Sequence, residues 1–236
     1  MAKKSAAPYM TSGEKLAGTV FLVIYVAVLP FVMTPAFDLL ESLLGAQIPA
    51  SLRSAVCYYS CFAAAVIIFH RFLGRTSRNF ADNLSVCCQT VVMGLVALYG
   101  LNELVYRLTR VLVGNHTNLN DMTVSAQIQG APRTTLLIVI FLAPFVEEVL
   151  FRGLVFGCLK GKSRTVAYLL SCGLFALLHV WQFAVVHKDI TYFLLMVQYM
   201  VPGAVLAWSY DRSGSLWTPI GLHAVVNALA TWAMWA

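Results

Sequence analysis

The sequence predicts an all-α protein, a polytopic transmembrane helix bundle of about seven spans whose last four form a separate core. Sixty per cent of the 236 residues are hydrophobic and only 11% are charged. The mean hydropathy is +0.78, which lies outside the range of soluble domains of this length. Apolar runs recur at the length of about 20 residues that a helix needs to cross a bilayer.

Seven segments have the length and composition of a span. Lysines precede the first segment, as in a secretory signal, but that segment is too long and no small-residue cleavage site follows it. We therefore expect an uncleaved first helix. In chain order the predicted spans are Leu16–Met33, Ser54–Phe72, Leu84–Arg107, Thr134–Leu159, Thr165–Val186, Thr191–Tyr210 and Leu216–Ala236.

A polar stretch divides these spans into two groups. Residues 111–133 contain Asn115, Asn118, Asn120 and Asp121 and end in the turn-prone Gly130-Ala131-Pro132. We interpret residues 1–110 as three amino-terminal transmembrane helices, 111–133 as an extracytoplasmic loop, and 134–236 as a four-helix core.

The basic residues orient the bundle, because lysine and arginine concentrate in cytoplasmic loops. If the amino terminus is cytoplasmic, ten of the 16 lysines and arginines lie on the inner side of the membrane and five on the outer side, while Arg152 lies inside a span. This places the carboxyl terminus outside. The ten are Lys3, Lys4, Lys15, Arg71, Arg75, Arg78, Lys160, Lys162, Arg164 and Arg212, and the five are Arg53, Arg107, Arg110, Arg133 and Lys188.

Charge and cysteine content exclude two classes of site. The net charge of +6 reflects topology and contact with anionic lipid headgroups, and no aromatic-interleaved basic stripe indicates nucleic acid. The six cysteines lie in or beside apolar spans without a CxxC pair. We interpret them as packing residues, with no disulfide framework or zinc ribbon.

Three polar clusters interrupt the last four spans. Ionisable groups inside a bilayer cost several kcal/mol, so they normally face a protein interior or a wet cavity and serve a function there. The clusters are Glu147 with Glu148 and Arg152, then His179, and then His223 with Asn227.

Helix geometry separates the roles of the two glutamates. Glu148 and Arg152 are spaced i,i+4 with the acid nearer the amino terminus, which favours an ion pair on one face. Glu147 points about 100° away around the helix. It has no local partner, so we expect it to bind a proton or to meet a histidine from another helix.

The clusters share one depth in the predicted bundle. The rise of a helix gives the distance of each polar residue from a basic residue at the predicted cytoplasmic end of its span. It is about 20 Å from Lys160 to Glu147 and about 22 Å from Arg164 to His179. From Arg212 it is about 17 Å to His223 and about 23 Å to Asn227. Small neighbours such as Ala143, Ala176, Ala224 and Ala228 allow close helix approach, so we expect the four side chains to converge on one cavity.

One carboxylate, two imidazoles and one carboxamide suit hydrolysis. A carboxylate with a histidine can orient and deprotonate water, and a second histidine with an amide can stabilise the oxyanion formed at a peptide carbonyl. No serine or cysteine is placed to act as nucleophile: Ser171 and Cys172 lie about two turns from His179. Water is therefore the predicted attacking group.

The motifs EExxxR at 147–152, FxxxH at 175–179 and HxxxN at 223–227 resemble the signature of the CPBP family. This family comprises CAAX proteases and bacteriocin-processing enzymes, also called the Abi family or Rce1-type glutamic intramembrane proteases. The resemblance covers about residues 134–236. It implies that Glu147 and His179 activate water and that His223 and Asn227 stabilise the oxyanion. Glu148, Arg152 and Phe175 would be supporting residues.

The resemblance also implies a multi-pass enzyme of a prokaryotic cell membrane, without a cofactor, that cleaves a membrane-associated or lipidated peptide or protein. Two alternatives stay open. A zinc-dependent protease could use Glu147, His179 and His223 as ligands. The sequence has no HExxH motif, however, and a zinc site normally requires three strong protein ligands. An inactive immunity or scaffold protein, or a proton-coupled carrier, could also use intramembrane acids and histidines. The sequence does not define substrate identity or oligomeric state.

Overall fold

The computed structural model describes residues 9–113 and 119–235, and within these ranges the chain is helical with no strand. This confirms the predicted fold class. The α-helices are α1 (Ser12–Val23), α2 (Leu29–Leu44), α3 (Ala50–Asp82), α4 (Leu84–Val113), α5 (Leu119–Gly130), α6 (Pro132–Leu137), α7 (Ala143–Glu148), α8 (Gly157–Leu159), α9 (Arg164–His187), α10 (Met196–Ser213) and α11 (Trp217–Trp235). The π-helical segments η1 (Ile24–Val28), η2 (Ile138–Leu142) and η3 (Val149–Phe156) and the 3₁₀ segment η4 (Ile190–Leu195) join neighbouring α-helices into longer runs.

Six helical runs among the described residues are long and apolar enough to cross a membrane, so the protein is a multi-pass membrane protein. They match the first six predicted spans in order. The seventh, Leu216–Ala236, corresponds to α11, which is not one of the six and contains two strongly polar side chains. Its final residue, Ala236, lies outside the described residues. The six runs are Ser12–Leu44, Ala50–Asp82, Leu84–Leu108, Pro132–Leu159, Arg164–His187 and Ile190–Ser213.

The stretch predicted as a loop at 111–133 is largely helical. α4 continues to Val113, and the 12-residue helix α5 lies against α6 and touches α11. Residues 114–118 lie outside the described residues. Polar composition led to the loop prediction, but α5 is stabilised by packing against the bundle, which the local sequence does not reveal. At 12 residues α5 is too short to span a bilayer.

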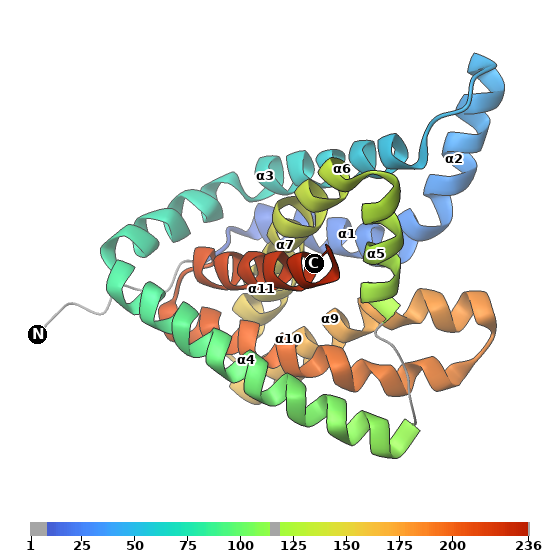
Figure 1. Ribbon diagram of the computed structural model, residues 1–236. Coiled ribbons are helices and arrows are strands. Elements are labelled where there is room, and N and C mark those ends of the chain that lie inside the picture. The colour runs from blue at the N-terminus through green and yellow to red at the C-terminus, as the bar shows by residue number, and fades with distance from the viewer. Residues whose placement is uncertain (1–8, 114–118, 236) are drawn as a thin grey trace, which may run out of the picture.

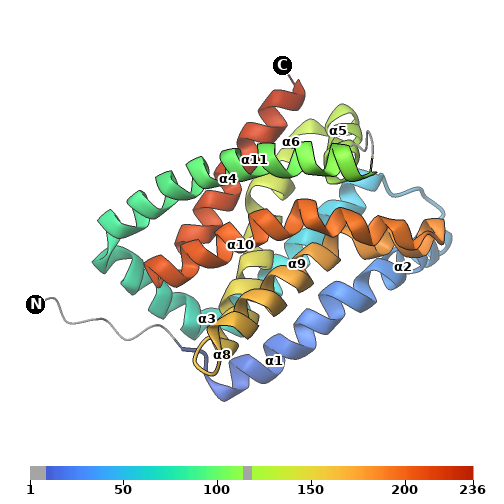
Figure 2. The same ribbon diagram turned by 90° about the horizontal axis from the view of Figure 1, so that it is seen from below.

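The long helices form a splayed bundle around the run that contains α7. α3 and α4 diverge from their shared turn at Asn83, with α7 and α11 between them (Figure 1). α10 packs against both α9 and α4, while α1 packs against α3 and η3. Seen from below, α1 lies on the side of the bundle opposite α4 and α11 (Figure 2).

A kink in α3 is held by a carboxylate from α1. Phe69 has non-helical angles, φ −103° and ψ 16°, which interrupts the backbone ladder and leaves nearby N–H groups without helical acceptors. The N–H of Phe72 instead donates to Glu14 Oε1 at 2.6 Å. Glu14 also completes a capping box with Thr11 and pairs with Arg75 at 3.3 Å. One buried carboxylate therefore fixes the start of α1 to the bend in α3.

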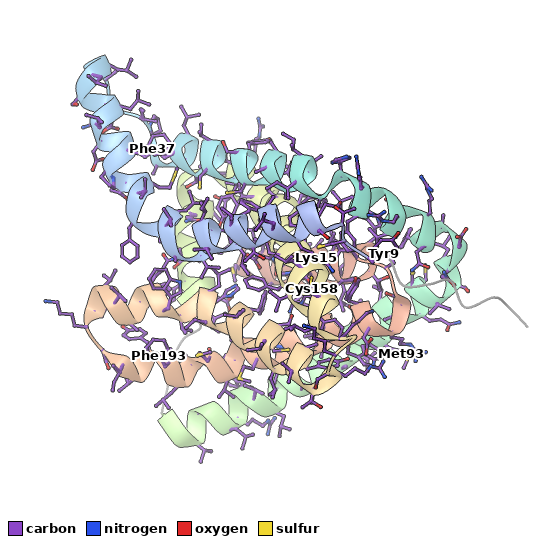
Figure 3. All side chains as sticks on the ribbon, turned by 180° about the vertical axis from the view of Figure 1, so that it is seen from behind. Tyr9, Lys15, Phe37, Met93, Cys158 and Phe193 are labelled. Carbon is purple, nitrogen blue, oxygen red and sulfur yellow. The ribbon has the colours of Figure 1, made fainter. Side chains whose placement is uncertain are left out.

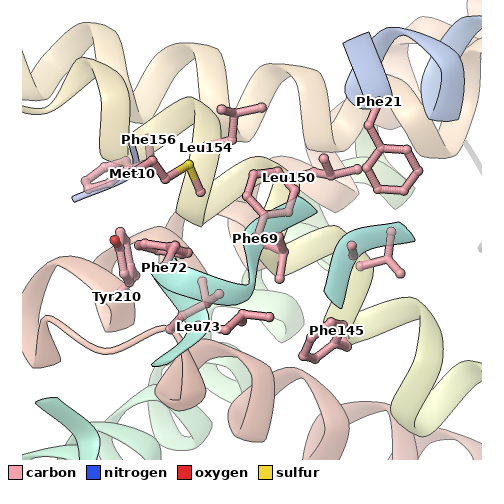
Figure 4. Packing of buried hydrophobic residues seen from close by; sticks show 14 of the residues in the cluster. Met10, Phe21, Phe69, Phe72, Leu73, Phe145, Leu150, Leu154, Phe156 and Tyr210 are labelled. Carbon is pink, nitrogen blue, oxygen red and sulfur yellow. The ribbon is translucent and has the colours of Figure 1, made fainter. Parts of the chain in front are cut away.

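The core beside this kink is aromatic. Phe69, Phe72, Phe156 and Tyr210 are each at most 1% exposed and pack together across α3, η3 and α10 (Figure 4). Gly18 lets α1 approach this core, because a Cβ there would lie only 2.5 Å from the Phe69 ring. Leucine and valine side chains from η3 fill the remaining space.

The second half of α3 also holds the turn between α10 and α11. Gly214 ends α10 with φ +67°, a conformation that favours glycine. Its carbonyl accepts from Asn79 Nδ2 at 2.6 Å, and the N–H of Leu216 donates to Thr76 Oγ1 at 2.7 Å. The start of α11, and so the position of His223, is thereby fixed by side chains of α3.

Glu14→Ala should lower the free energy of unfolding by about 1–3 kcal/mol, because it leaves a buried backbone N–H of α3 without an acceptor. Thermal unfolding of detergent-solubilised protein measures this change. Glu103→Ala is the matched control, since Glu103 pairs with Arg107 at 2.8 Å on an exposed helix face and such pairs contribute little. Equal losses for the two variants would contradict the role of Glu14.

Candidate active site

The side chains of the three polar clusters, which we call the polar layer, are Glu147, Glu148, Arg152, His179, His223 and Asn227. Glu148 is the fully buried centre of this layer. Its Oε1 accepts from Arg152 Nη1 and from His223 Nδ1, both at 2.9 Å. The predicted i,i+4 pair with Arg152 is therefore present, with both side chains 0% exposed. Helix spacing predicted the pair with Arg152 and offered the histidines as partners for Glu147. The bond from His223 of α11 to the carboxylate of Glu148 was not predicted.

Arg152 ties the carboxylate to two further helices. Its Nη2 donates to the Gly203 carbonyl of α10 at 3.0 Å, and its guanidinium lies 4.3 Å from the centre of the Phe175 ring of α9. α10 lies close to α9 at this point: a Cβ at Gly203 would be in van der Waals contact with Cys172, 3.4 Å from its Cα. Phe175 thus supports the site through its ring.

His179 is held between two aromatic rings. Its ring stacks on Tyr199 with centroids 4.6 Å apart and meets Phe175 at 4.7 Å. Its Nδ1 lies 2.9 Å from the Phe175 carbonyl. A carbonyl oxygen can only accept, so Nδ1 carries the proton of the neutral ring and Nε2 presents a free lone pair.

His223 and Asn227 lie one turn apart on α11. The carboxylate of Glu148 accepts from Nδ1 of His223, which leaves Nε2 as the second functional atom of that ring. Asn227 Nδ2 donates one hydrogen to the Val139 carbonyl at 2.8 Å. Val139 belongs to the π-helical segment η2, a type of turn that is frequent at functional sites. The amide retains a second N–H.

Glu147 differs from its neighbour in having no protein partner. Its side chain is 7% exposed, and the described residues provide no hydrogen bond to its carboxyl group. It faces a cavity of about 1260 Å³, and His179, His223 and Asn227 line the same cavity. The structure therefore brings together the four side chains that the sequence singled out; their catalytic roles remain predictions.

The three residues considered as zinc ligands are less well arranged for a metal. In the described part of the chain, no three His, Cys, Asp or Glu side chains are grouped so that they could hold a metal ion. Glu147, His179 and His223 share the cavity without forming such a group.

Three features of the site were not predicted from the sequence. Tyr199, which orders the ring of His179, is 20 residues away in the chain, and no local spacing connects them. α5 lines the cavity with several polar side chains, among them Gln127 and Gln129, although its composition indicated a loop. The contact between His223 and Glu148 likewise spans 75 residues.

Comparison with known proteins agrees with this geometry. Residues 129–229 match the family described as type II CAAX prenyl endopeptidase Rce1-like, a range that includes every residue of the polar layer. A curated relative is the "Putative membrane peptidase YdiL" of Bacillus subtilis (strain 168). It is 25% identical over 192 residues, which cover 79% of this chain and 72% of that protein.

Comparison with solved structures gave no significant match. The similarity depends on the family match, which covers residues 129–229, and on this relative. That part of the chain is similar to Rce1-like CAAX prenyl endopeptidases, and the two matches together support a membrane peptidase.

Proposed function

We propose that the protein is an intramembrane endopeptidase that cleaves a membrane-associated protein or peptide with a water molecule activated by Glu147 and His179. The observation that carries this proposal is the shared cavity: an unpartnered carboxylate, two oriented imidazoles and a carboxamide line one buried space. Such a set can supply both a general base and an oxyanion site.

His179 suits the proton-accepting role. Its Nδ1–H is engaged with the Phe175 carbonyl, so Nε2 is the atom that takes a proton from water. The flanking rings of Phe175 and Tyr199 fix the plane of the imidazole. Glu147 orients the same water and accepts a hydrogen bond from it, and the proton later passes to the leaving amine.

His223 and Asn227 suit the stabilisation of the oxyanion. The free N–H of Asn227 can donate directly, since Val139 engages only one of its two amide hydrogens. Nδ1 of His223 is held by Glu148, so a donor hydrogen on Nε2 requires the imidazolium form. The carboxylate of Glu148 attracts that positive charge as well as the charge of Arg152 and fixes the ring through Nδ1, so Glu148 acts as a positioning residue.

One observation favours the zinc alternative enough to test it. Both histidines bond through Nδ1, one to a backbone carbonyl and one to a carboxylate. Metal-ligating histidines commonly have such partners. The grouping of the side chains nevertheless favours metal-free hydrolysis, and chelation separates the two mechanisms.

Glu147→Gln should reduce the cleavage rate about 10²- to 10⁴-fold, because a neutral amide lacks the charge with which the carboxylate orients the attacking water and assists its deprotonation, while the fold stays intact. Proteomics of membrane fractions from cells carrying either form would reveal the peptide termini that depend on Glu147. Glu103→Gln, on an exposed helix face, is the control and should leave these termini unchanged. Identical termini for wild type and Glu147→Gln would instead indicate a non-enzymatic membrane protein.

Strong chelators should leave the cleavage rate unchanged, because no step of the proposed mechanism uses a metal. Purified protein in proteoliposomes, incubated with a substrate identified by the proteomic comparison, provides the measurement. Treatment with 1,10-phenanthroline is compared with an isomer that does not chelate. Loss of activity that added Zn²⁺ restores would establish the zinc mechanism instead.

Activity should fall as the pH is lowered, because the general base must be unprotonated to take a proton from water. Protonation of Glu147 or His179 removes that capacity, so the sign is a loss toward acid. The pH profile of cleavage in proteoliposomes measures it. A rate that rises steadily as the solution becomes more acidic would contradict general-base catalysis.

A further inference from the structure

The cavity occupies only one end of the bundle. The residues that line the cavity in the run Pro132–Leu159 lie before or at Glu147. In α9 the lining residues start at Phe175, and in α11 they start at His223. In α3 and α4 they lie at 54–58 and 98–110, the ends farthest from the shared turn at Asn83. Each of these helices therefore contributes to the cavity from the layer of Glu147, His179 and His223 toward the same end, which we call the open end.

The other end of the bundle, the closed end, is packed solid. The rings of Phe72, Phe156 and Tyr210 fill the space beyond Arg152 (Figure 4). Beyond them, Asn79 and Thr76 bind the turn between α10 and α11. A peptide that approached from the closed end would have to displace this core, so substrate enters through the open end.

α5 forms part of the wall at the open end. Gln127, Gln129 and Asp121 of α5 line the cavity together with Asn102 and Arg110 of α4. At the catalytic end, Phe175 and Leu206 lie among the lining residues beside the four polar side chains of the candidate site. The cavity volume of about 1260 Å³ exceeds the roughly 300–1,000 Å³ of small-molecule pockets. A polypeptide segment fits a cavity of this size that has polar and apolar lining along its length.

Basic residues mark the closed end as cytoplasmic. Eight of those in the described ranges lie toward the closed end and five toward the open end. Figure 3 shows Phe37 and Phe193 toward one end of the molecule, and Lys15 beside Cys158 away from that end. Lysine and arginine are enriched on the cytoplasmic side, so the open end faces away from the cytoplasm. The eight are Lys15, Arg71, Arg75, Arg78, Lys160, Lys162, Arg164 and Arg212, and the five are Arg53, Arg107, Arg110, Arg133 and Lys188.

We propose that the cavity receives its substrate from the extracytoplasmic side of the membrane. The substrate is an exported, membrane-anchored polypeptide whose scissile bond lies near the bilayer centre and whose polar flank emerges beside α5. A lipidated carboxyl terminus presented by a cytoplasmic protein would meet the closed end. The side from which the cavity opens does not depend on the proposed protease function, whereas the substrate class rests on that function.

Accessibility of a cysteine placed in the cavity tests this proposal. Ala230 lines the cavity on α11, whereas its neighbour Leu229 is 39% exposed on the outer surface and does not line it. Ala230→Cys and Leu229→Cys therefore place a thiol at nearly one depth on two different faces. Both are made in the Glu147→Gln protein, so labelling does not depend on turnover.

A small, charged, membrane-impermeant thiol reagent is added to intact cells or to inside-out vesicles. Modification is read by mass on the tryptic fragment 213–236, which contains none of the native cysteines. In intact cells, Ala230→Cys should react about tenfold or more faster than Leu229→Cys, because a thiol in lipid forms little thiolate. In inside-out vesicles that difference should disappear.

Faster modification of Ala230→Cys in inside-out vesicles than in intact cells would overturn the proposal, as would equal rates for the two variants in intact cells. Neither result bears on catalysis. Failure of the protease function appears separately, as unchanged peptide termini in the Glu147→Gln comparison.

Discussion

The polar layer depends on the carboxylate of Glu148, which is fully buried and accepts hydrogen bonds from Arg152 and His223. A charge in this position is tolerated only because it is paired, and removal of one partner of a buried pair typically costs about 3–5 kcal/mol. Through Arg152 the carboxylate also reaches the Gly203 carbonyl. One side chain thus fixes the relative positions of α7, α10 and α11, and these helices carry most of the candidate site.

Adjacent positions in the chain give two glutamates different environments. A helix turns about 100° per residue, so Glu148 points into the packed helices while Glu147 faces the cavity. The first is held by partners and can position His223. The second has no protein partner among the described residues and is free to bind water. This division explains why two consecutive acids are useful at one depth of a membrane bundle.

Apolar run lengths and helical spacing were enough to predict the fold class and the ion pair of Glu148 and Arg152, because both depend on the rise and rotation along one helix. Contacts between helices could not be predicted in the same way. The bond from His223 to Glu148 and the stacking of Tyr199 on His179 depend on the kink in α3, the π-helical turns and the close approach at Gly203. α5 was missed because its polar composition is typical of a loop and only its packing makes it a helix.

The central claim is that Glu147 and His179 hold one water molecule inside the cavity. A high-resolution experimental structure of the protein in a lipid environment tests it most directly. It should show an ordered water within hydrogen-bonding distance of the Glu147 carboxylate and of His179 Nε2, with His223 Nδ1 on Glu148. A Glu147 side chain turned toward lipid, or a cavity in which no water contacts both residues, would contradict it.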